Sequence, residues 1–401
     1  MSDALRVAIV VSHPIQTFVH FYRVLAQVPS IRLRVLFASS IGTRPYYDKE
    51  MAVRIQWETD LISGYDHEFL PEAEGIHRVG FWKINNPSLS GRLVRFAPDA
   101  VMIHGYSHMT ALRALRWCRG RGVPVLIWSD SELLHRRSAW RRAVKQVVLP
   151  PLFRRIDAFL TVGDNNEAYY RHYGVPEAKM FRTPFTIDEQ SFSRVLSGRT
   201  RIRAAVREQF GIPQNAFLAL FVGKLRAGKR VGDLIVAIRA ILREPGAGRP
   251  VCLALAGDGA QRSELEALAA DVRERCFFLG FVNLDQLPEV YAAADVLVHP
   301  SEREAYGLVA SEASLVGLPL VMSDQVGSVG PTDRARPGEN TIVFPCGDTA
   351  ALARAIADLA GDPVLYERMS QASLRIAQEL GVGRSVKGFL NAVRAVTGRQ
   401  V

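Results

Sequence analysis

Runs of apolar residues alternate with stretches of helical periodicity along the whole chain, and this alternation restricts the fold more than any other feature. Runs such as Leu5–Val11 and Val251–Ala256 indicate strands that are buried on both faces of a sheet. The other predicted strands are Leu33–Ala38, Ala100–His104, Val123–Trp128, Ala158–Val162, Ala216–Val222, Cys276–Leu279, Val296–His299 and Pro319–Met322. Helical stretches such as Thr17–Gln27 separate them, so we expect an α/β fold with doubly wound parallel sheets.

The series of strands restarts after about residue 200, which predicts two domains. A chain of 401 residues suits two domains of roughly 150 to 200 residues each. Residues 201–211 have the pattern of a helix that leads into the second domain. We expect one Rossmann-like domain over residues 1–195, a second over 196–383, and a helix over 384–401 that packs back toward the N-terminal domain.

Composition excludes several other classes of protein. Apolar residues make up 48% of the chain and charged residues 22%, as in an ordinary globular protein. No apolar run approaches the ~20 residues of a membrane span and the N-terminus lacks a signal-peptide pattern, so we expect a cytoplasmic protein. The four cysteines lie far apart without C-x-x-C spacing, which indicates neither a disulfide framework nor a zinc site.

Positive charge is concentrated in the first half of the chain. Residues 1–200 hold 27 Lys and Arg against 18 Asp and Glu, so they carry nine of the ten excess positive charges. Much of this excess lies in residues 113–155, which include Arg136, Arg137, Arg141, Arg142 and Lys145 among Trp140, Val144, Val147 and Val148. A helix with this pattern either lies against anionic lipid or an acidic polymer, or packs on the core with a solvated basic face.

The densest polar motif lies where ligands bind in such folds, beyond the carboxyl end of a predicted strand. It runs over residues 300–313, and in it Glu304 and Glu312 flank a Tyr-Gly-Leu sequence at the predicted start of a helix. Free amides at a helix start can receive phosphate oxygens, and the two carboxylates can accept hydrogen bonds from the hydroxyls of a sugar ring and of a ribose. The alternative is a helix whose first turn merely prefers acidic residues.

Two further predicted strands are followed by loops that suit a diphosphate. Lys224 and Lys229 could converge on a diphosphate and stabilise its charge as it leaves, unless they only form a solvated basic loop. Gly257-Asp258-Gly259 predicts a tight turn that lets backbone approach a ligand, although such turns are common. No D-x-D motif or histidine cluster is present, so we expect no metal site.

Together these motifs resemble the family 4 glycosyltransferases of the GT-B fold, in which two Rossmann-like domains face each other across a cleft. The resemblance covers the second half almost continuously, including residues 279–282, 291–295 and 340–347. It implies a retaining transferase that uses a nucleotide-diphosphate sugar, a UDP-sugar or GDP-sugar, without a cofactor or metal. The implied roles are Lys224 and Lys229 for the diphosphate, Glu304 for the donor sugar, Glu312 for the ribose, the amides of Tyr306, Gly307 and Leu308 for the phosphates, and Gly257, Asp258, Gly259, Phe281 and Val282 for the base and sugar pocket.

The first half resembles one bacterial subgroup of the same family. Ser12-His13-Pro14-Ile15-Gln16 replaces the usual glycine pair after the first strand, and Ile55-Gln56-Trp57 and Gly64-Tyr65 also fit that subgroup. His13 and Gln16 are candidates for contacting donor phosphate or acceptor hydroxyls, unless they only cap the loop. Several relatives have a histidine where Ser129-Asp130 stands here, so Asp130 and His104 are the candidates for orienting the acceptor. Residues 326–332 depart from the family pattern, and no role is carried over to Gly327 or Ser328.

The functional hypothesis is a retaining glycosyltransferase of cell-surface polysaccharide or glycolipid assembly. Because the resemblance places the acceptor in the N-terminal domain, the positive charge there favours an anionic acceptor, such as a lipid-linked pyrophosphate sugar, and peripheral contact with an anionic membrane. The alternatives are a GT-B sugar-nucleotide epimerase and a non-catalytic nucleotide-sugar-binding protein. A nicotinamide dehydrogenase is disfavoured because residues 11–14 replace a G-x-G-x-x-G turn, and a nucleic-acid binder because no recognition module is present.

Overall fold

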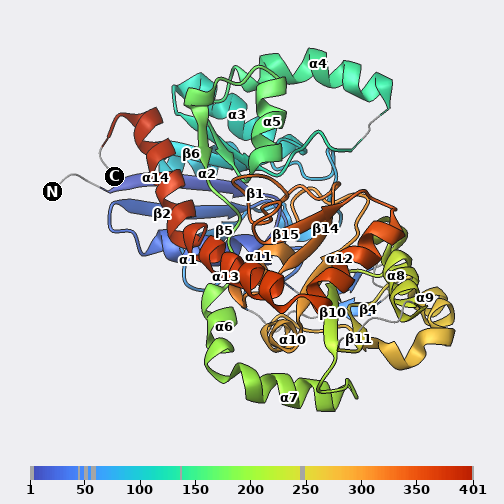
Figure 1. Cartoon of the computed structure of the whole chain (residues 1–401). Coiled ribbons are helices and arrows are strands. Elements are labelled where there is room, and N and C mark those ends of the chain that lie inside the picture. The colour runs from blue at the N-terminus through green and yellow to red at the C-terminus, as the bar shows by residue number, and fades with distance from the viewer. Residues whose placement is uncertain are drawn as a thin grey trace. The chain divides into compact units, whose positions relative to one another are not determined.

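Parallel sheets form the centre of both parts of the chain (Figure 1). The computed structural model describes residues 4–43, 60–135, 138–243 and 249–399, and the backbone alone of residues 46–48 and 53–55. The chain divides into unit 1, which comprises Met1–Pro45, Asp60–Ile187 and Gly381–Val401, and unit 2, which comprises Tyr46–Thr59 and Asp188–Leu380. A short antiparallel ladder of β3 (Tyr46–Asp48) and β4 (Val53–Ile55) is separate from both sheets.

Unit 1 contains a seven-stranded sheet with the order β5-β2-β1-β6-β7-β8-β9, in which all paired strands are parallel. The strands are β1 (Leu5–Val11), β2 (Ile31–Phe37), β5 (His67–Phe69), β6 (Ala100–His104), β7 (Val125–Ser129), β8 (Ala158–Thr161) and β9 (Met180–Arg182). The helices are α1 (Gln16–Ala26), α2 (Leu89–Phe96), α3 (Met109–Arg121), α4 (Ala139–Phe153), α5 (Asp164–His172) and α14 (Val382–Thr397). The strand order reverses between β1 and β6, and ligands bind at such switch points in open α/β sheets.

Unit 2 contains a six-stranded parallel sheet with the order β12-β11-β10-β13-β14-β15. The strands are β10 (Phe217–Val222), β11 (Val251–Ala256), β12 (Cys276–Gly280), β13 (Val296–His299), β14 (Leu320–Ser323) and β15 (Thr341–Phe344). The helices are α6 (Glu189–Arg194), α7 (Arg199–Gln209), α8 (Val231–Arg243), α9 (Arg262–Leu268), α10 (Leu287–Ala293), α11 (Val309–Leu315), α12 (Thr349–Gly361) and α13 (Pro363–Glu379). The switch point of this sheet lies between β10 and β13.

The structure confirms the predicted fold class, because the apolar runs form parallel strands that are covered on both faces. Every residue of β10 and of β11 is buried. In unit 2, Phe217 of β10, Leu234 of α8 and Ile356 of α12 belong to one apolar core. The sequence did not predict β5, β9 or β15, which are short strands at or near the sheet edges with partly exposed side chains.

The last helix, α14, belongs to unit 1 although its sequence follows unit 2. Phe389 packs edge-on against Phe21 of α1, with ring centroids 5.6 Å apart, and Ser385 Oγ donates a hydrogen bond of 2.7 Å to the Pro184 carbonyl. A Cβ at Gly388 would lie 2.1 Å from the Arg182 carbonyl oxygen, so the helix approaches β9 at a position that only glycine permits. Helix α14 therefore completes the core of unit 1.

The basic region of the sequence includes most of α3 and all of α4, and four of the apolar residues of α4 remain exposed. Trp140, Val144, Val147 and Val148 are each exposed by half or more, so they are not packed into the core. Arg136 and Arg137 of this region, like Gln56 and Trp57, lie outside the described residues. Within the described residues, no helix is long and apolar enough to cross a membrane.

Candidate active site

Three loops follow the carboxyl ends of neighbouring strands in unit 2. β10, β11 and β13 continue into residues 223–229, 257–259 and 300–307. Because parallel strands end at the same edge, these loops lie together beside the switch point. The backbone confirms this for the first two loops, since the Leu225 amide donates a hydrogen bond of 2.9 Å to the Asp258 carbonyl. The loops selected from the sequence therefore belong to one region.

Glycines allow the backbones of these loops to approach each other closely. Gly257 has a φ of +147°, and a Cβ on it would lie 1.9 Å from the Gly223 carbonyl oxygen. A Cβ on Gly259 would lie 2.4 Å from the Leu225 carbonyl oxygen. The carboxylate of Asp258 accepts a hydrogen bond of 2.8 Å from the Gly259 amide, which holds the turn. The turn is thus fixed by contacts within the protein.

Lys229 and Glu304 form an ion pair across the switch point. Lys229 ends a short 3₁₀ turn after β10, and Glu304 lies in the loop after β13. The ammonium of Lys229 contacts Glu304 Oε2, and His299 Nε2 lies 3.2 Å from the same oxygen. The side chains of Lys229, Glu304 and His299 are 11%, 23% and 1% exposed. Two candidates that are 75 residues apart in sequence are therefore brought together in space.

The surroundings of Glu304 keep its carboxylate ionised. Burial opposes ionisation, but the hydrogen bond from His299 and the positive charge of Lys229 outweigh it and lower the pKa of Glu304 to about 2. An ionised carboxylate only accepts hydrogen bonds, so the hydrogen between the two side chains belongs to His299 Nε2. Burial lowers the pKa of His299, which is therefore neutral at physiological pH. Its ring also stacks on Phe221, with the ring planes 8° apart.

The motif around Gly307 leads into helix α11, which begins at Val309 with Leu308 as its N-cap. Gly307 has a φ of +95°, in the left-handed region that favours glycine. The carbonyl of Tyr306 accepts a hydrogen bond of 2.7 Å from the Ser328 amide, which ties this turn to the neighbouring loop. Among the described residues, no backbone carbonyl accepts a hydrogen bond from the amide of Gly307 or Leu308. These amides are therefore not used by the backbone of the described fold.

Glu312 is half-buried on α11 and is hydrogen-bonded to a tyrosine. The hydroxyl of Tyr291 on α10 donates to Glu312 Oε2 at 2.5 Å. Burial raises the pKa of Glu312, and the hydrogen bond from Tyr291 acts in the opposite direction. One carboxylate oxygen is thus occupied by the protein, and the second is the one that could accept a ligand hydroxyl.

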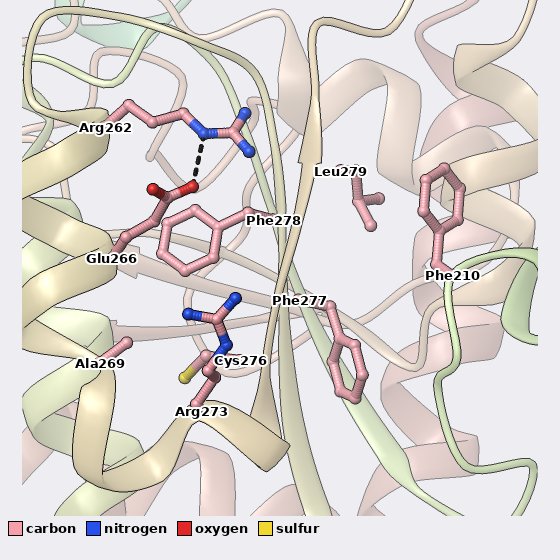
Figure 2. Close-up of a pocket in the computed structure, with 9 residues that line it drawn as sticks. All are labelled: Phe210, Arg262, Glu266, Ala269, Arg273, Cys276, Phe277, Phe278 and Leu279. Atoms are coloured by element: carbon pink, nitrogen blue, oxygen red, sulfur yellow. Dashed lines mark hydrogen bonds and ion pairs between the residues drawn. The ribbon is translucent and has the colours of Figure 1, made fainter.

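A small pocket lies beside β12, the strand that precedes the predicted base-site residues Phe281 and Val282 (Figure 2). Its volume is about 290 Å³, and it is lined in part by Phe278 and by Arg262, whose guanidinium lies 5.6 Å from the Phe278 ring centroid. Figure 2 shows Arg262 paired with Glu266, at 2.8 Å. The predicted base-site residues Phe281 and Val282 follow this strand directly but do not line the pocket.

The loop after β10 carries two lysines that could bind an anion. Lys224 follows Gly223 directly, on the same loop as Lys229. Among the described residues, no group of three or more His, Cys, Asp or Glu side chains is placed to hold a metal ion. The ammonium groups of these lysines and the backbone amides near Gly307 are groups that could bind an anion at this edge of the sheet.

In unit 1, the predicted residues lie around the switch point between β1 and β6. His13 and Gln16 follow β1, His104 ends β6, and Asp130 follows β7. Tyr22 Oη lies 2.7 Å from His104 Nε2, and the rings of Phe18 and His104 have centroids 4.0 Å apart. Burial, with a smaller contribution from His108, lowers the pKa of His104 to about 3. His104 is therefore neutral near pH 7 and serves as a hydrogen-bonding group rather than a cation.

Three functional candidates were missed in the sequence. His299 was predicted only as the end of a strand, yet it donates to Glu304. Tyr291 was noted only as part of an alanine-rich stretch, yet its hydroxyl binds Glu312. His108 caps α3 through Nδ1, and burial lowers its pKa to about 4. A polar residue at the carboxyl end of a buried strand was the signal that could have identified His299.

Two family models match the chain. The model "Glycosyl transferases group 1" matches residues 202–375, and "Glycosyl transferase 4-like domain" matches residues 60–186. D-inositol 3-phosphate glycosyltransferase of Streptomyces coelicolor is 33% identical over 226 residues, which cover 53% of this chain and 49% of that protein. 2-deoxystreptamine glucosyltransferase of Streptomyces kanamyceticus is 31% identical over 205 residues, which cover 49% of this chain and 50% of that protein. The chain thus matches about half the length of these relatives.

Solved structures share the fold over nearly the whole chain. Anabaena Alr3699/HepE in complex with UDP has a TM-score of 0.72 and 16% identity, and the match covers 96% of this chain and 99% of that chain. Sucrose-phosphate synthase from Thermosynechococcus elongatus has a TM-score of 0.70 and 20% identity, with coverage of 96% and 97%. At these identities the likeness establishes the fold.

Proposed function

Because this chain belongs to the GT-B glycosyltransferases that the two family models describe, we propose that it is a retaining glycosyltransferase that moves a sugar from a nucleotide-diphosphate sugar to an acceptor hydroxyl. Unit 2 holds the donor in this proposal, and unit 1 holds the acceptor. The observation that carries it is the contact of Lys229 with Glu304 at the switch point of unit 2. It brings one cation and one ionised carboxylate together, which supports the binding of a phosphate next to a sugar hydroxyl in this region.

Each residue of the donor site has a distinct task. Glu304 accepts hydrogen bonds from donor-sugar hydroxyls, since its pKa of about 2 keeps it ionised at neutral pH. Lys229 and Lys224 bind the diphosphate and stabilise the charge that grows on it as the bond to the sugar breaks. The amides of residues 306–308 bind phosphate oxygens, and Glu312 binds the ribose through the oxygen that Tyr291 does not occupy.

We propose that retention results from acceptor attack on the side of the leaving group. A glycosidase that retains configuration uses two carboxylates on opposite sides of the anomeric carbon. Glu304 and Glu312 lie on one segment of unit 2, and both are engaged by neighbouring side chains of that unit. The departing phosphate takes the acceptor proton in this mechanism, so no general base from unit 1 is required.

The donor is a UDP-sugar or a GDP-sugar, bound without a metal. The solved Anabaena structure was determined in complex with UDP, which supports UDP as the first nucleotide to test. Thermal unfolding of the purified chain with UDP, GDP, ADP, CMP and TDP, each with and without magnesium, identifies the base. We expect one nucleotide to raise the midpoint equally with and without magnesium. No rise with any of them at millimolar concentration would refute the donor site.

Two variants test the assigned residues. We expect Lys229→Ala and Glu304→Ala to lower transfer by orders of magnitude while the fold is retained. Glu302→Ala is the matched control, because its side chain lies in the same loop and is 53% exposed. Near-normal transfer by either variant would exclude its residue from the site. Donor turnover without an acceptor would point instead to an epimerase, and nucleotide binding without turnover to a binding protein.

The acceptor is anionic and lies at a membrane surface in this proposal, as in polysaccharide or glycolipid assembly. The support is the charge of residues 1–200, which hold nine of the ten excess positive charges. Flotation with liposomes of anionic lipid should recover the protein at low salt and lose it as salt rises. A protein that stays unbound at low salt would contradict the membrane contact.

A further inference from the structure

Helix α4 lines two hollows of unit 1 that differ in the residues around them. The first is a polar pocket of about 440 Å³ between residues 132–135, α4 and α5. The second is a groove of about 920 Å³ between α3 and α4, lined largely by apolar side chains. Lys145 lines both hollows. Neither hollow includes a residue of the proposed donor site or a residue that was a candidate for contacting the acceptor.

Three hydrogen-bonded polar side chains lie where the two hollows meet. Tyr106 faces the groove and Tyr169 faces the pocket, and their hydroxyl oxygens are 2.5 Å apart. The ammonium of Lys145 donates to the Tyr169 hydroxyl at 3.1 Å and lies 5.1 Å from the centre of its ring. One ligand could therefore have a polar end in the pocket and an apolar part in the groove, with Lys145 at the junction.

The polar pocket is suited to an anion with several oxygens. Arg142 and Lys145 line it, and Arg142 forms no ion pair with any described residue. His135 also lines it; its side chain is 9% exposed, and its Nδ1 lies 2.7 Å from a Glu132 oxygen. Its Nε2 is buried and has no hydrogen-bond partner among the described residues. A guanidinium and an ammonium beside one pocket match the oxygens of a phosphate, and the unpartnered Nε2 of His135 can accept a hydrogen bond from the hydroxyl of a monoprotonated phosphate ester.

Glu132 does not cancel this positive character. Its two oxygens accept from the side chain of His135 at 2.7 Å and from the His135 amide at 3.2 Å. The carboxylate thus fixes the imidazole with its hydrogen on Nδ1 and directs Nε2 away from itself. The basic side chains that line the two hollows are Arg116, Arg119, Arg142, Lys145 and Arg155, and Glu132 is the acidic one.

The groove leaves apolar side chains exposed to water. Val144, Val147 and Val148 line it and are 51%, 74% and 52% exposed. Leu112 and Leu115 of α3 line the opposite side. Exposed apolar surface of this extent, bordered by basic residues, indicates a ligand that is both apolar and anionic.

We propose that the two hollows form one binding site for an anionic amphiphile, the phosphate ester of a long apolar alcohol as found in membrane lipids. The phosphate occupies the pocket beside Arg142, Lys145 and His135, and the apolar chain lies in the groove along α4. The site binds individual molecules, in contrast to a basic surface that only adsorbs to a bilayer.

Calorimetric titration with monomeric alkyl phosphates tests this site on the whole chain. Dodecyl phosphate, octyl phosphate and inorganic phosphate are compared below the concentrations at which they form micelles. We expect affinity to rise with chain length, by up to about fourfold for each methylene that the groove buries. An alkyl trimethylammonium of the same length should not bind. Equal affinity for inorganic phosphate and dodecyl phosphate would overturn the proposal.

Matched variants separate the two ends of the ligand. Arg142→Ala should weaken dodecyl phosphate binding about tenfold or more, because it removes a charge-assisted hydrogen bond. Arg141→Ala, on the same helix, lines neither hollow and should bind normally. Val147→Asp should weaken binding to a similar extent, whereas Val364→Asp, at a site 80% exposed in unit 2, should not.

Two further measurements distinguish this site from a general loss of folding and from adsorption to a bilayer. The nucleotide-induced rise in the unfolding midpoint is recorded for each variant; we expect it to equal that of the wild type, which shows that unit 2 is intact. Failure of the wild type to bind dodecyl phosphate, with a normal nucleotide response, would overturn this site alone. Binding to anionic vesicles without binding to monomeric alkyl phosphate would overturn it in favour of surface adsorption.

Discussion

Replacement of Glu304 by glutamine should destabilise the protein by an amount that the structure fixes. Glutamine has nearly the shape of the protonated acid but cannot be ionised, so the variant resembles wild type with Glu304 protonated. The pKa of Glu304 is lowered from 4.5 to about 2. At 1.36 kcal/mol per pH unit, this corresponds to about 3 kcal/mol of the free energy of unfolding at neutral pH. Its side chain is 23% exposed, so solvent screening removes little of this.

The same shift fixes how the loss depends on pH. Because the pKa is lower in the folded protein than in the unfolded chain, the stabilisation is complete above pH 4.5 and is lost as pH falls toward 2. The difference between wild type and Glu304→Gln should therefore fall from about 3 kcal/mol at pH 7 to less than half of this at pH 3.

Urea unfolding at pH 7 and pH 3 measures this difference. Because the chain has two units, hydrogen exchange of the peptide that contains Val296–His299 assigns the transition to unit 2. Glu302→Gln is the control, since its side chain is 53% exposed and lies 3.8 Å from its partner Arg230; we expect a change within about 0.5 kcal/mol. A loss below about 1 kcal/mol at pH 7, or an equal loss at both pH values, would refute the reasoning.

Three further changes probe other parts of unit 2. Gly257→Ala should lower the unfolding midpoint strongly or prevent folding, because the new Cβ would lie 1.9 Å from a carbonyl oxygen; thermal unfolding followed by circular dichroism measures it. Arg207→Leu should cost about 3 to 5 kcal/mol in urea unfolding, because Arg207 is fully buried and pairs with Asp295 at 2.8 Å. Tyr291→Phe removes a hydrogen bond that lowers the pKa of Glu312, so that pKa should rise further. As the pH is lowered from 8 to 5, the nucleotide affinity of the variant should therefore begin to fall at a higher pH than that of the wild type.

Each of these changes has a matched control in the same unit. A Cβ at Gly361 meets no atom within 4 Å, so Gly361→Ala should leave the midpoint unchanged or raise it slightly. Arg201 is exposed on the same helix as Arg207, and Arg201→Leu should change stability little. Tyr366→Phe should leave the pH dependence of nucleotide affinity unchanged. A control that behaves like its partner would show that the effect does not come from the named contact.

The sequence predicted where the candidate site lies better than it predicted how the site is held together. Buried parallel strands have a distinct apolar pattern, so the ends of β10, β11 and β13 and the loops after them were located correctly. Contacts between residues far apart in sequence have no such pattern. Two examples are the contact of Lys229 with Glu304 and the hydrogen bond of Tyr291 to Glu312. Both depend on strand order and helix packing, which a local stretch of sequence does not reveal.

Short-range geometry limited the prediction in the same way. A helix was expected to open at about Gly307, but α11 begins at Val309. Gly307 adopts a φ of +95°, which lies outside the helical region, and a Cβ on it would lie 3.0 Å from a side-chain carbon of Val326 in the neighbouring loop. That loop includes residues 326–332, the stretch to which no role could be assigned from sequence. The contact of this loop with the turn at Gly307 could therefore not be predicted from the sequence.

The two switch points differ in electrostatic character, and this difference bears on which ligand each unit attracts. In unit 2, the buried pair of Lys229 and Glu304 is charged at neutral pH. In unit 1, burial lowers the pKa of His104 to about 3 and that of His108 to about 4, so both are neutral near pH 7 and offer hydrogen bonds without charge. The histidines at that switch point therefore suit a neutral hydroxyl, and they do not account for the binding of an anion that we propose for unit 1. That proposal depends on the arginines and lysine of α3 and α4, so a test on Arg142 separates anion binding from the chemistry at the end of β6.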